Sequence, residues 1–195
     1  MPPRPIVYLQ QAMHRLFVAL RPPPDIRDRL SSTMAGVPTA RWQDDAQLHL
    51  TLRYIGPVER PVAEDLAVAL AGIHAPAPAV ALAGVGRFDK RGRTDTLWAG
   101  VAPREALIHL HHKIGQAVRR VGLPAEPRAF LPHITLARLA RGADVEGEIA
   151  AWRLAHAALA GPAFTLPHLV LYESHLGREG ATYDAIARWP LDALR

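Results

Sequence analysis

Along this chain of 195 residues, segments with the hydrophobic pattern of a strand alternate with segments that have the pattern of a helix. Short apolar runs at 15–20 and 48–56 end next to prolines or at a glycine, which predicts buried strands. At 59–73 and 104–121, by contrast, apolar side chains recur every three or four positions, as on one face of a helix. The segment 22–36 begins with prolines and ends at a glycine, so it is predicted to be a helix as well.

The second half of the chain continues this alternation. Strands are predicted at 77–88 and 95–101, joined by a polar turn, and then at 131–139, 164–172 and 182–189, with a helix over 145–159. Strands and helices therefore follow each other in two similar rounds, the pattern of a mixed α/β (α+β) fold. Because the first twelve residues are rich in proline and weakly patterned, we expect an N-terminal extension over 1–12 and a single domain over 13–195.

One short phrase occurs twice. Its first copy, "HLTL", begins at His49, and its second, "HITL", begins at His133, 84 positions later. Both copies lie in predicted strands, where successive side chains point to opposite faces. His49 and Thr51 are therefore expected to share one face, as are His133 and Thr135, while the aliphatic residues between them enter the core. If the two strands lie side by side, both imidazoles and both hydroxyls face one cleft.

This set of groups suits phosphoryl chemistry. Imidazole titrates near neutral pH, so one ring can accept a proton while the other donates one. A threonine hydroxyl can donate a hydrogen bond to a non-bridging phosphate oxygen, where charge develops in the transition state. The residues therefore predict acid–base hydrolysis without a metal, but they do not show which histidine plays which part.

Composition sets broad limits on the class of protein. There are no cysteines, which excludes disulfides, thiolate metal sites and cysteine nucleophiles and fits a reducing compartment. No run approaches the ~18 apolar residues of a membrane span, and we expect a cytoplasmic protein. The net charge is +5, and 21 of the 23 basic residues are arginine, which suits an acidic partner such as RNA. A genome-wide preference for arginine codons explains the same numbers, so charge alone decides nothing.

At the two motifs the sequence resembles the 2H phosphoesterase superfamily, and most of all the RNA 2',3'-cyclic phosphodiesterase family, formerly called 2'-5' RNA ligases. The resemblance runs from about Met13 to the C-terminus and includes "HRLFVALRPP", the "RW" before the first motif, "LWAGV" and "LYESHLGREGATYDAIARWPL". It implies a bilobal fold of two pseudo-symmetric lobes, each a small, mainly antiparallel sheet backed by helices, with the active site in the cleft. It also implies hydrolysis of an RNA-terminal 2',3'-cyclic phosphate to a 2'-phosphate. By the same resemblance His49 is the proton donor, His133 the acceptor, and Thr51 and Thr135 hold the phosphate.

Three further residues are candidates for substrate binding. The resemblance assigns Arg138, five positions after His133, to clamp phosphate or stack on a base, and Tyr54, five after His49, to stack on the nucleobase. Strict alternation puts both on the face opposite the histidines, so they reach the cleft only if each strand bends or ends after the leucine of its motif. By the same count Arg53 lies on the histidine face, where we expect extra affinity for phosphate.

Other interpretations of the sequence remain open. The same chemistry could act on a 2'-5' oligonucleotide or a small cyclic nucleotide, or the chain could be a non-catalytic, basic RNA-binding module. The tract "HLHHK" from His109 looks like a metal site, but no carboxylate or third ligand stands at a usable spacing, so a solvated helix face is favoured. We expect no metal and no cofactor, a monomer, and RNA or a nucleotide with a 2',3'-cyclic phosphate as partner.

Overall fold

The computed structural model describes residues 13–140, 145–177 and 180–192, so the predicted extension over 1–12 lies outside it. One path of antiparallel strands runs β7-β4-β5-β6-β3-β1-β8-β9, and β2 pairs with β6 outside that path. The strands are β1 (Met13–Leu20), β2 (Ala40–Trp42), β3 (Leu50–Glu59), β4 (Ala79–Lys90), β5 (Arg93–Ala102), β6 (His133–Leu139), β7 (Phe164–Thr165), β8 (His168–Gly177) and β9 (Gly180–Pro190).

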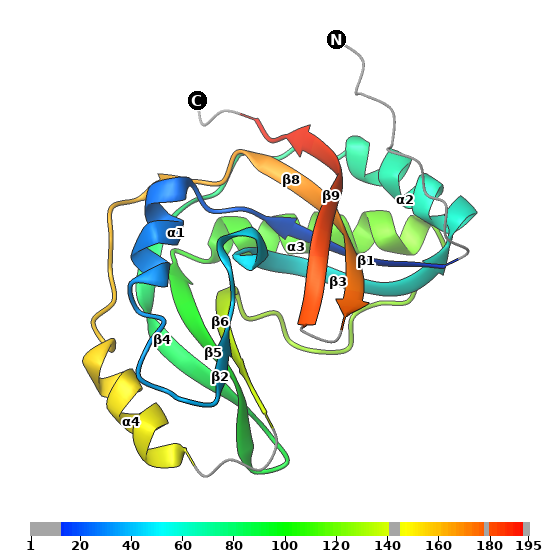
Figure 1. Ribbon diagram of the computed structural model, residues 1–195. Helices are drawn as coiled ribbons and strands as arrows, with labels where there is room; N and C mark the ends of the chain where they lie inside the picture. The colour runs from blue at the N-terminus through cyan, green and yellow to red at the C-terminus, as the bar shows by residue number, and fades with distance from the viewer. Residues whose placement is uncertain (1–12, 141–144, 178–179, 193–195) are drawn as a thin grey trace.

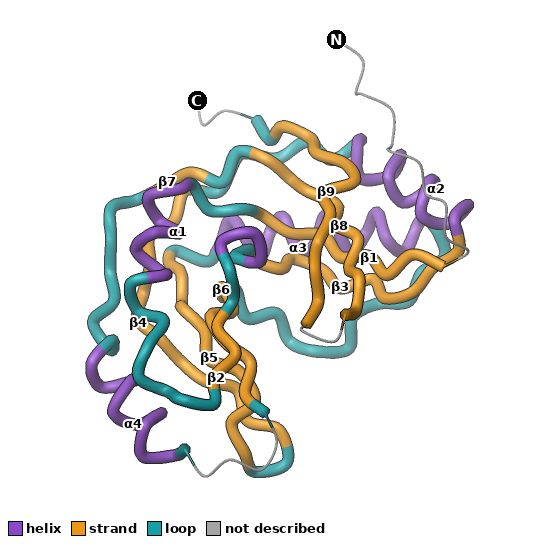
Figure 2. Tube along the Cα trace, viewed as in Figure 1, coloured by secondary structure: helices purple, strands orange, loops and turns teal. Residues whose placement is uncertain are grey.

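This sheet is divided into two halves that meet at an angle (Figure 2). One half contains β3, β1, β8 and β9, and the other contains β6, β5, β4 and β7. The halves are joined where Leu50 of β3 pairs with Ile134 of β6. The expectation of two lobes, each a small antiparallel sheet backed by helices, is confirmed, and the two sheets share one seam.

The helices lie outside the two halves (Figure 1). The helices α2 (Arg60–Ala71) and α3 (Glu105–Arg120) pack together and against β1 and β3. The helices α1 (Pro24–Ser31) and α4 (Glu146–Ala155) lie beside the other half, and a short 3₁₀ helix, η1 (Asp45–Gln47), precedes β3. The helix α3 buries the face that its sequence period predicts, with Leu107, Leu110, Ile114, Ala117 and Val118, whereas on α2 the apolar Val68 is exposed. Burial of one leucine side chain stabilises the fold by roughly 1.5–3 kcal/mol.

Several features differ from the sequence prediction; β3, for example, continues past Gly56, where the strand was predicted to end, to Glu59. The first helix ends at Ser31 rather than near Gly36, because the hydroxyls of Ser32 and Thr33 bond back to its last carbonyls. The strand predicted over 164–172 is two strands, interrupted before β8 at Pro167, which has no amide proton for a ladder. The short elements β2 and η1 were not predicted, since three residues are too few to show a period. Among the described residues, no helix has the length and apolar character needed to cross a membrane.

Candidate active site

The two histidine motifs meet at the seam between the halves of the sheet. Leu50 and Ile134 are direct partners, and both are completely buried. Continuing this antiparallel register by one residue in each direction sets His49 opposite Thr135 and Thr51 opposite His133. Directly opposed Cβ atoms lie about 4.5–5.5 Å apart and diagonal ones about 7–8 Å. His49 and His133 are diagonal neighbours in this register, so both rings can reach one phosphate group.

Each of the two histidines makes the same kind of hydrogen bond, to the carbonyl oxygen two residues before it. The Nδ1 of His49 lies 2.6 Å from the carbonyl oxygen of Gln47, and the Nδ1 of His133 lies 2.7 Å from that of Leu131. Because a carbonyl oxygen can only accept, Nδ1 must carry the proton in each ring. In the neutral rings Nε2 then keeps its lone pair, and this is the nitrogen that can exchange a proton with a ligand.

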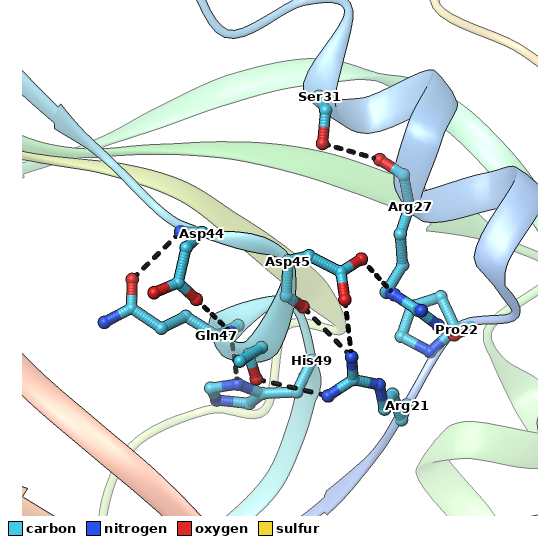
Figure 3. Close-up of polar contacts among 9 residues, drawn as sticks. Arg21, Pro22, Arg27, Ser31, Asp44, Asp45, Gln47 and His49 are labelled. Atoms are coloured by element: carbon cyan, nitrogen blue, oxygen red, sulfur yellow. Dashed lines mark hydrogen bonds and ion pairs between the residues drawn. The ribbon is translucent and has the colours of Figure 1, made fainter.

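The carbonyl that orients His49 belongs to a firmly anchored turn, shown in Figure 3. The side chain of Asp44 accepts from the amide of Gln47, and the side chain of Gln47 accepts from the amide of Asp44, a reciprocal cap of η1. The carboxylate of Asp45 binds Arg21 at 2.8 Å and Arg27 at 2.6 Å. These contacts hold the turn against the end of β1 and the start of α1, and so fix the ring of His49.

Aromatic rings surround both histidines. The ring centroids of Phe17 and Tyr183 lie 4.8 Å and 5.2 Å from that of His49, with Tyr172 stacked on Phe17. On the other side, the ring of Phe88 meets that of His133 edge-on at 4.8 Å, and Trp98 lies beside both. Each imidazole therefore stands in a largely apolar wall that removes water from most of its surface.

This environment changes the protonation of the histidines. The pKa of His49 is lowered to about 4, mainly by burial and to a smaller extent by the positive charges of His133 and Arg138, against the opposing effect of the Gln47 carbonyl. Burial, with Arg138, also lowers the pKa of His133. Both rings are therefore neutral at pH 7 in the free protein. A charged ring forms at lower pH, or when an anion between the rings offsets the cost of burial.

A β-bulge follows each motif and changes which face the later side chains occupy. On β3, Ala19 pairs with Thr51 but Val18 pairs with Arg53, so one residue of β3 is extra. On β6, Trp98 pairs with Thr135 but Leu97 pairs with Ala137, with the same surplus of one. Two successive residues then point to the core side, Leu52 with Arg53 and Leu136 with Ala137, and all four are buried. The next residues, Tyr54 and Arg138, return to the histidine face.

Both bulges are secured from outside their ladders. The bulged residue Leu52 has its carbonyl oxygen 2.7 Å from Nδ1 of His111, a residue of α3 whose ring is stacked on Phe130 at 4.2 Å. The equivalent carbonyl of Leu136 accepts from the amide of Gln43 at 2.8 Å. At each of these two bulges the carbonyl of the extra residue thus has a hydrogen-bond donor.

Arg138 belongs to β6, five residues after His133. It pairs across the ladder with Thr96 on one side and Arg41 on the other, and its guanidinium donates to the buried hydroxyl of Thr96 at 2.6 Å. Its charge lowers the pKa of His49, of His133 and of the Tyr183 hydroxyl, although burial raises the pKa of Tyr183 overall. The condition for Arg138 to reach the histidine face, a bend after the motif, is met.

Tyr54 meets the same condition. It pairs with Phe17, whose ring contacts His49, so one side chain separates Tyr54 from the histidine. The ring of Tyr54 is 41% exposed and its hydroxyl accepts from Arg15 at 2.6 Å. Tyr54 is therefore available to a ligand and is not part of the core.

The expectation that Arg53 shares the histidine face is wrong. The bulge turns Arg53 to the helix side, where it is 7% exposed, and its guanidinium donates to the carbonyl of Pro124. It also lies 3.7 Å from the carboxylate of Glu126. Arg53 therefore binds the segment between α3 and β6 to β3, on the side of the sheet away from the histidines.

The tract from His109 has no metal-binding arrangement. His109 and His112 are exposed, as expected of a solvated helix face, whereas His111 is half-buried at the Leu52 bulge. Within the described ranges no group of three or more histidine, aspartate or glutamate side chains is placed to hold a metal ion.

Sequence reasoning missed several side chains of this site. Tyr183 lies in the closing stretch of the family resemblance and Arg41 in the "RW" before the first motif, and neither was given a role. Phe17, Phe88 and Trp98 look like ordinary core residues in strands. Only their register across the sheet places these rings against the histidines.

Comparison with known proteins identifies the family of this chain. Residues 22–178 match the family model of the 2'-5' RNA ligase superfamily. A protein of Geobacillus stearothermophilus named RNA 2',3'-cyclic phosphodiesterase is 31% identical over 159 residues, which cover 80% of this chain and 49% of the relative. The chain thus spans about half the length of that relative. An Escherichia coli protein of the same name is 28% identical over 189 residues, 91% of this chain and 96% of its own.

A solved structure shares the whole fold. The crystal structure of Escherichia coli LigT in apo form superimposes with a TM-score of 0.73 and 26% sequence identity. The superposition covers 93% of this chain and 99% of the other.

Proposed function

The chain belongs to the 2'-5' RNA ligase superfamily, and from that premise we propose that it hydrolyses an RNA-terminal 2',3'-cyclic phosphate to a 2'-phosphate. The observation that carries the proposal is the seam at Leu50 and Ile134, which brings two identical His-x-Thr motifs onto one face. The relatives of this name from Geobacillus stearothermophilus and Escherichia coli support the choice of substrate.

The two histidines share the proton transfers. Water attacks phosphorus in line, and Nε2 of His133 takes its proton as the new P–O bond forms. His49 is charged once the anionic phosphate lies beside it, and it gives its Nε2 proton to the departing 3'-oxygen as the bond from that oxygen to phosphorus breaks. The donor and acceptor roles follow the family resemblance. The hydrogen bonds from Nδ1 to Gln47 and Leu131 are alike in the two rings and leave Nε2 of each for the exchange.

The negative charge of the phosphate is met by hydroxyls and a guanidinium. Thr51 and Thr135, each opposite a histidine, hold the non-bridging oxygens as charge spreads over them. Arg138 adds a fixed positive charge on the same face, beside Thr96. Proton donor, acceptor and anion-binding groups are then all supplied by side chains, so we propose that the reaction needs no metal and no cofactor.

We also propose that Tyr54 stacks on the terminal base. Its exposed ring is separated from His49 by Phe17 alone, a suitable position for the base of the nucleotide whose phosphate reacts. A cytoplasmic monomer acting on RNA or a nucleotide with a 2',3'-cyclic phosphate completes the proposal.

The test is turnover of 2',3'-cyclic AMP by the purified protein, with the product identified by phosphorus NMR. We expect adenosine 2'-phosphate as the only product. We also expect the same rate in about 5 mM EDTA, which removes trace divalent metals. A 3'-phosphate product would refute the role given to His49, and loss of activity in EDTA would refute metal independence. Binding of RNA without any turnover would identify the non-catalytic RNA-binding module instead.

A further inference from the structure

A large basic pocket lies next to the histidine centre, and the chemistry described above uses Arg138 at its edge but not its other basic residues. It has a volume of about 1110 Å³ and begins at Arg138 and Tyr183. It continues along β5 and β6 to the hairpin that joins β4 to β5, and α4 closes another side. Pockets of roughly 300–1,000 Å³ hold a drug-sized ligand, so this one exceeds the needs of a single nucleotide.

The charge of the pocket is strongly positive. Among the described residues, its lining has two acidic side chains, Asp95 and Glu146, and six basic ones: Arg41, Arg87, Lys90, Arg91, Arg93 and Arg138. Glu146 is already bound by Arg87, and the carboxylate of Asp95 accepts from the hydroxyl of Thr96. The pocket therefore keeps an excess of cations for a ligand.

The tip of the hairpin contributes three basic side chains that lie outside the core. Lys90 and Arg93 pair across the hairpin, with Arg91 in the turn between them, and all three side chains are exposed. Five of the six basic residues of the pocket are arginines, whose planar fork binds phosphate through two parallel hydrogen bonds.

The spacing matches a chain of phosphates rather than one. Arg138 pairs with Thr96, and Arg93 lies three residues before Thr96 on β5, a distance of about 10 Å along the strand. A ligand whose phosphate reacts at the histidines must extend this far to reach the hairpin. A cyclic mononucleotide, with its single phosphate, ends before it.

We propose that this pocket binds the backbone phosphates of the nucleotides that precede the cyclic end, so that the protein prefers an RNA strand to a mononucleotide. The nature of the ligand rests on the proposed function. The site itself rests on the pocket and its charges. Arg91 and Arg93 are its distal contacts, and Arg138 connects it to the reacting phosphate.

The experiment compares two substrates and two double variants. The substrates are 2',3'-cyclic AMP and a six-nucleotide RNA that ends in a 2',3'-cyclic phosphate. The test variant is R91Q/R93Q, which removes two charges from the hairpin. The control is R119Q/R120Q, which removes two exposed charges from the last turn of α3, behind β3.

We expect the ratio of kcat/KM for the hexamer to that for the mononucleotide to fall at least tenfold in R91Q/R93Q and to stay constant in the control. Each phosphate contact contributes about 0.7 to the slope of log kcat/KM against log salt for a single strand, so this slope should become shallower by about 1.4. An equal fall for both substrates, or an unaltered ratio, would overturn the inference.

Binding separates this inference from the proposed function. Fluorescence anisotropy with a labelled hexamer carrying a terminal 2'-phosphate needs no turnover, and R91Q/R93Q should bind at least tenfold more weakly than the control. If the protein hydrolyses neither substrate but shows this difference, the proposed function fails and the phosphate site stands. If it hydrolyses both substrates and the variants bind alike, the phosphate site fails and the function stands.

Discussion

Leu50 of β3 pairs with Ile134 of β6, and within the described residues this single pair joins the two strands that carry the histidine motifs. Each leading histidine precedes its member of the pair by one position. Because the strands are antiparallel, each histidine faces the threonine of the other motif. The site is therefore shared equally between the two halves of the sheet, and neither half contains a complete set of groups.

Removal of either histidine should abolish most of the activity. His49→Ala and His133→Ala should each lower kcat for 2',3'-cyclic AMP by at least ~10²-fold, since each removes one proton transfer. The double variant should be little worse than either single one, because donor and acceptor act as a unit. Thermal unfolding of each variant serves as the control for folding. Multiplicative losses in the double variant would show that the two rings act independently.

The pH dependence follows from the lowered pKa values of both rings. Activity requires one protonated and one neutral histidine, so it falls at low pH when both are charged and at high pH when both are neutral. Since the pKa of His49 is about 4 and that of His133 lies below its usual range, kcat/KM should be bell-shaped with its maximum on the acid side of pH 6.5. A kcat/KM that rises to a plateau above pH 7 would contradict this assignment.

Two substitutions of Arg138, one that removes its charge and one that keeps it, test the cause of this pH profile. The charge of Arg138 lowers the pKa of both histidines, so Arg138→Gln should raise both values and move both limbs of the profile to higher pH. Arg138→Lys keeps the charge and should leave the limbs in place, while losing the forked contact with phosphate. If both variants move the limbs equally, the cause is not the charge of Arg138.

Tyr54 should contribute to binding more than to stability. If its exposed ring stacks on the base, Tyr54→Ala should weaken nucleotide binding by roughly 1–3 kcal/mol. Tyr54→Phe loses only the hydrogen bond with Arg15 and should bind nearly as well as the wild type. Calorimetric titration with adenosine 2'-phosphate measures both. A large loss of thermal stability with unchanged affinity would assign Tyr54 a structural role.

The His111 contact predicts a stability effect far from the reacting groups. His111→Phe keeps an aromatic ring against Phe130 but leaves the carbonyl of Leu52 without its donor, which should cost about 1–3 kcal/mol of unfolding free energy. His112→Phe, one position along on an exposed side chain, is the control and should change little. Urea denaturation at pH 7 checks both, and equal effects would show that the bulge does not depend on this bond.

The sequence predicted the arrangement of the two histidines and two threonines better than that of the side chains around them. The repeated phrase brought His49, Thr51, His133 and Thr135 to attention because strand alternation is regular over so short a distance. Strand alternation gave the wrong face for the residue after each motif, Arg53 and Ala137, because a bulge depends on how a strand pairs with its neighbours and not on its own period. In β6 the apolar doublet of Leu136 and Ala137 hints at the bulge, whereas in β3 a buried arginine, Arg53, stands at the equivalent place and conceals it.

The aromatic walls were beyond reach for a related reason. Tyr172 and Tyr183 lie more than a hundred residues after His49, and no local pattern connects them. Their contact with the histidine requires β1 to lie between β3 and β8, with β9 beyond it, which is a property of the sheet order alone.

The order of strands also determines when activity can appear during folding. The half of the sheet that holds His49 takes β1 from the beginning of the chain and β8 and β9 from its end, while the other half takes β4, β5 and β6 from the middle. The half that holds His49 is not a continuous segment, so a growing chain cannot complete it until β8 and β9 have been made, after all the strands of the other half, and its pairing of β1 with β8 spans a long separation. A protein that stops short of β9 lacks Tyr183 beside His49, although every reacting group has already been made. If the proposed function holds, turnover therefore reports whether β8 and β9 have joined β1, which makes it a readout for truncation at the end of the chain.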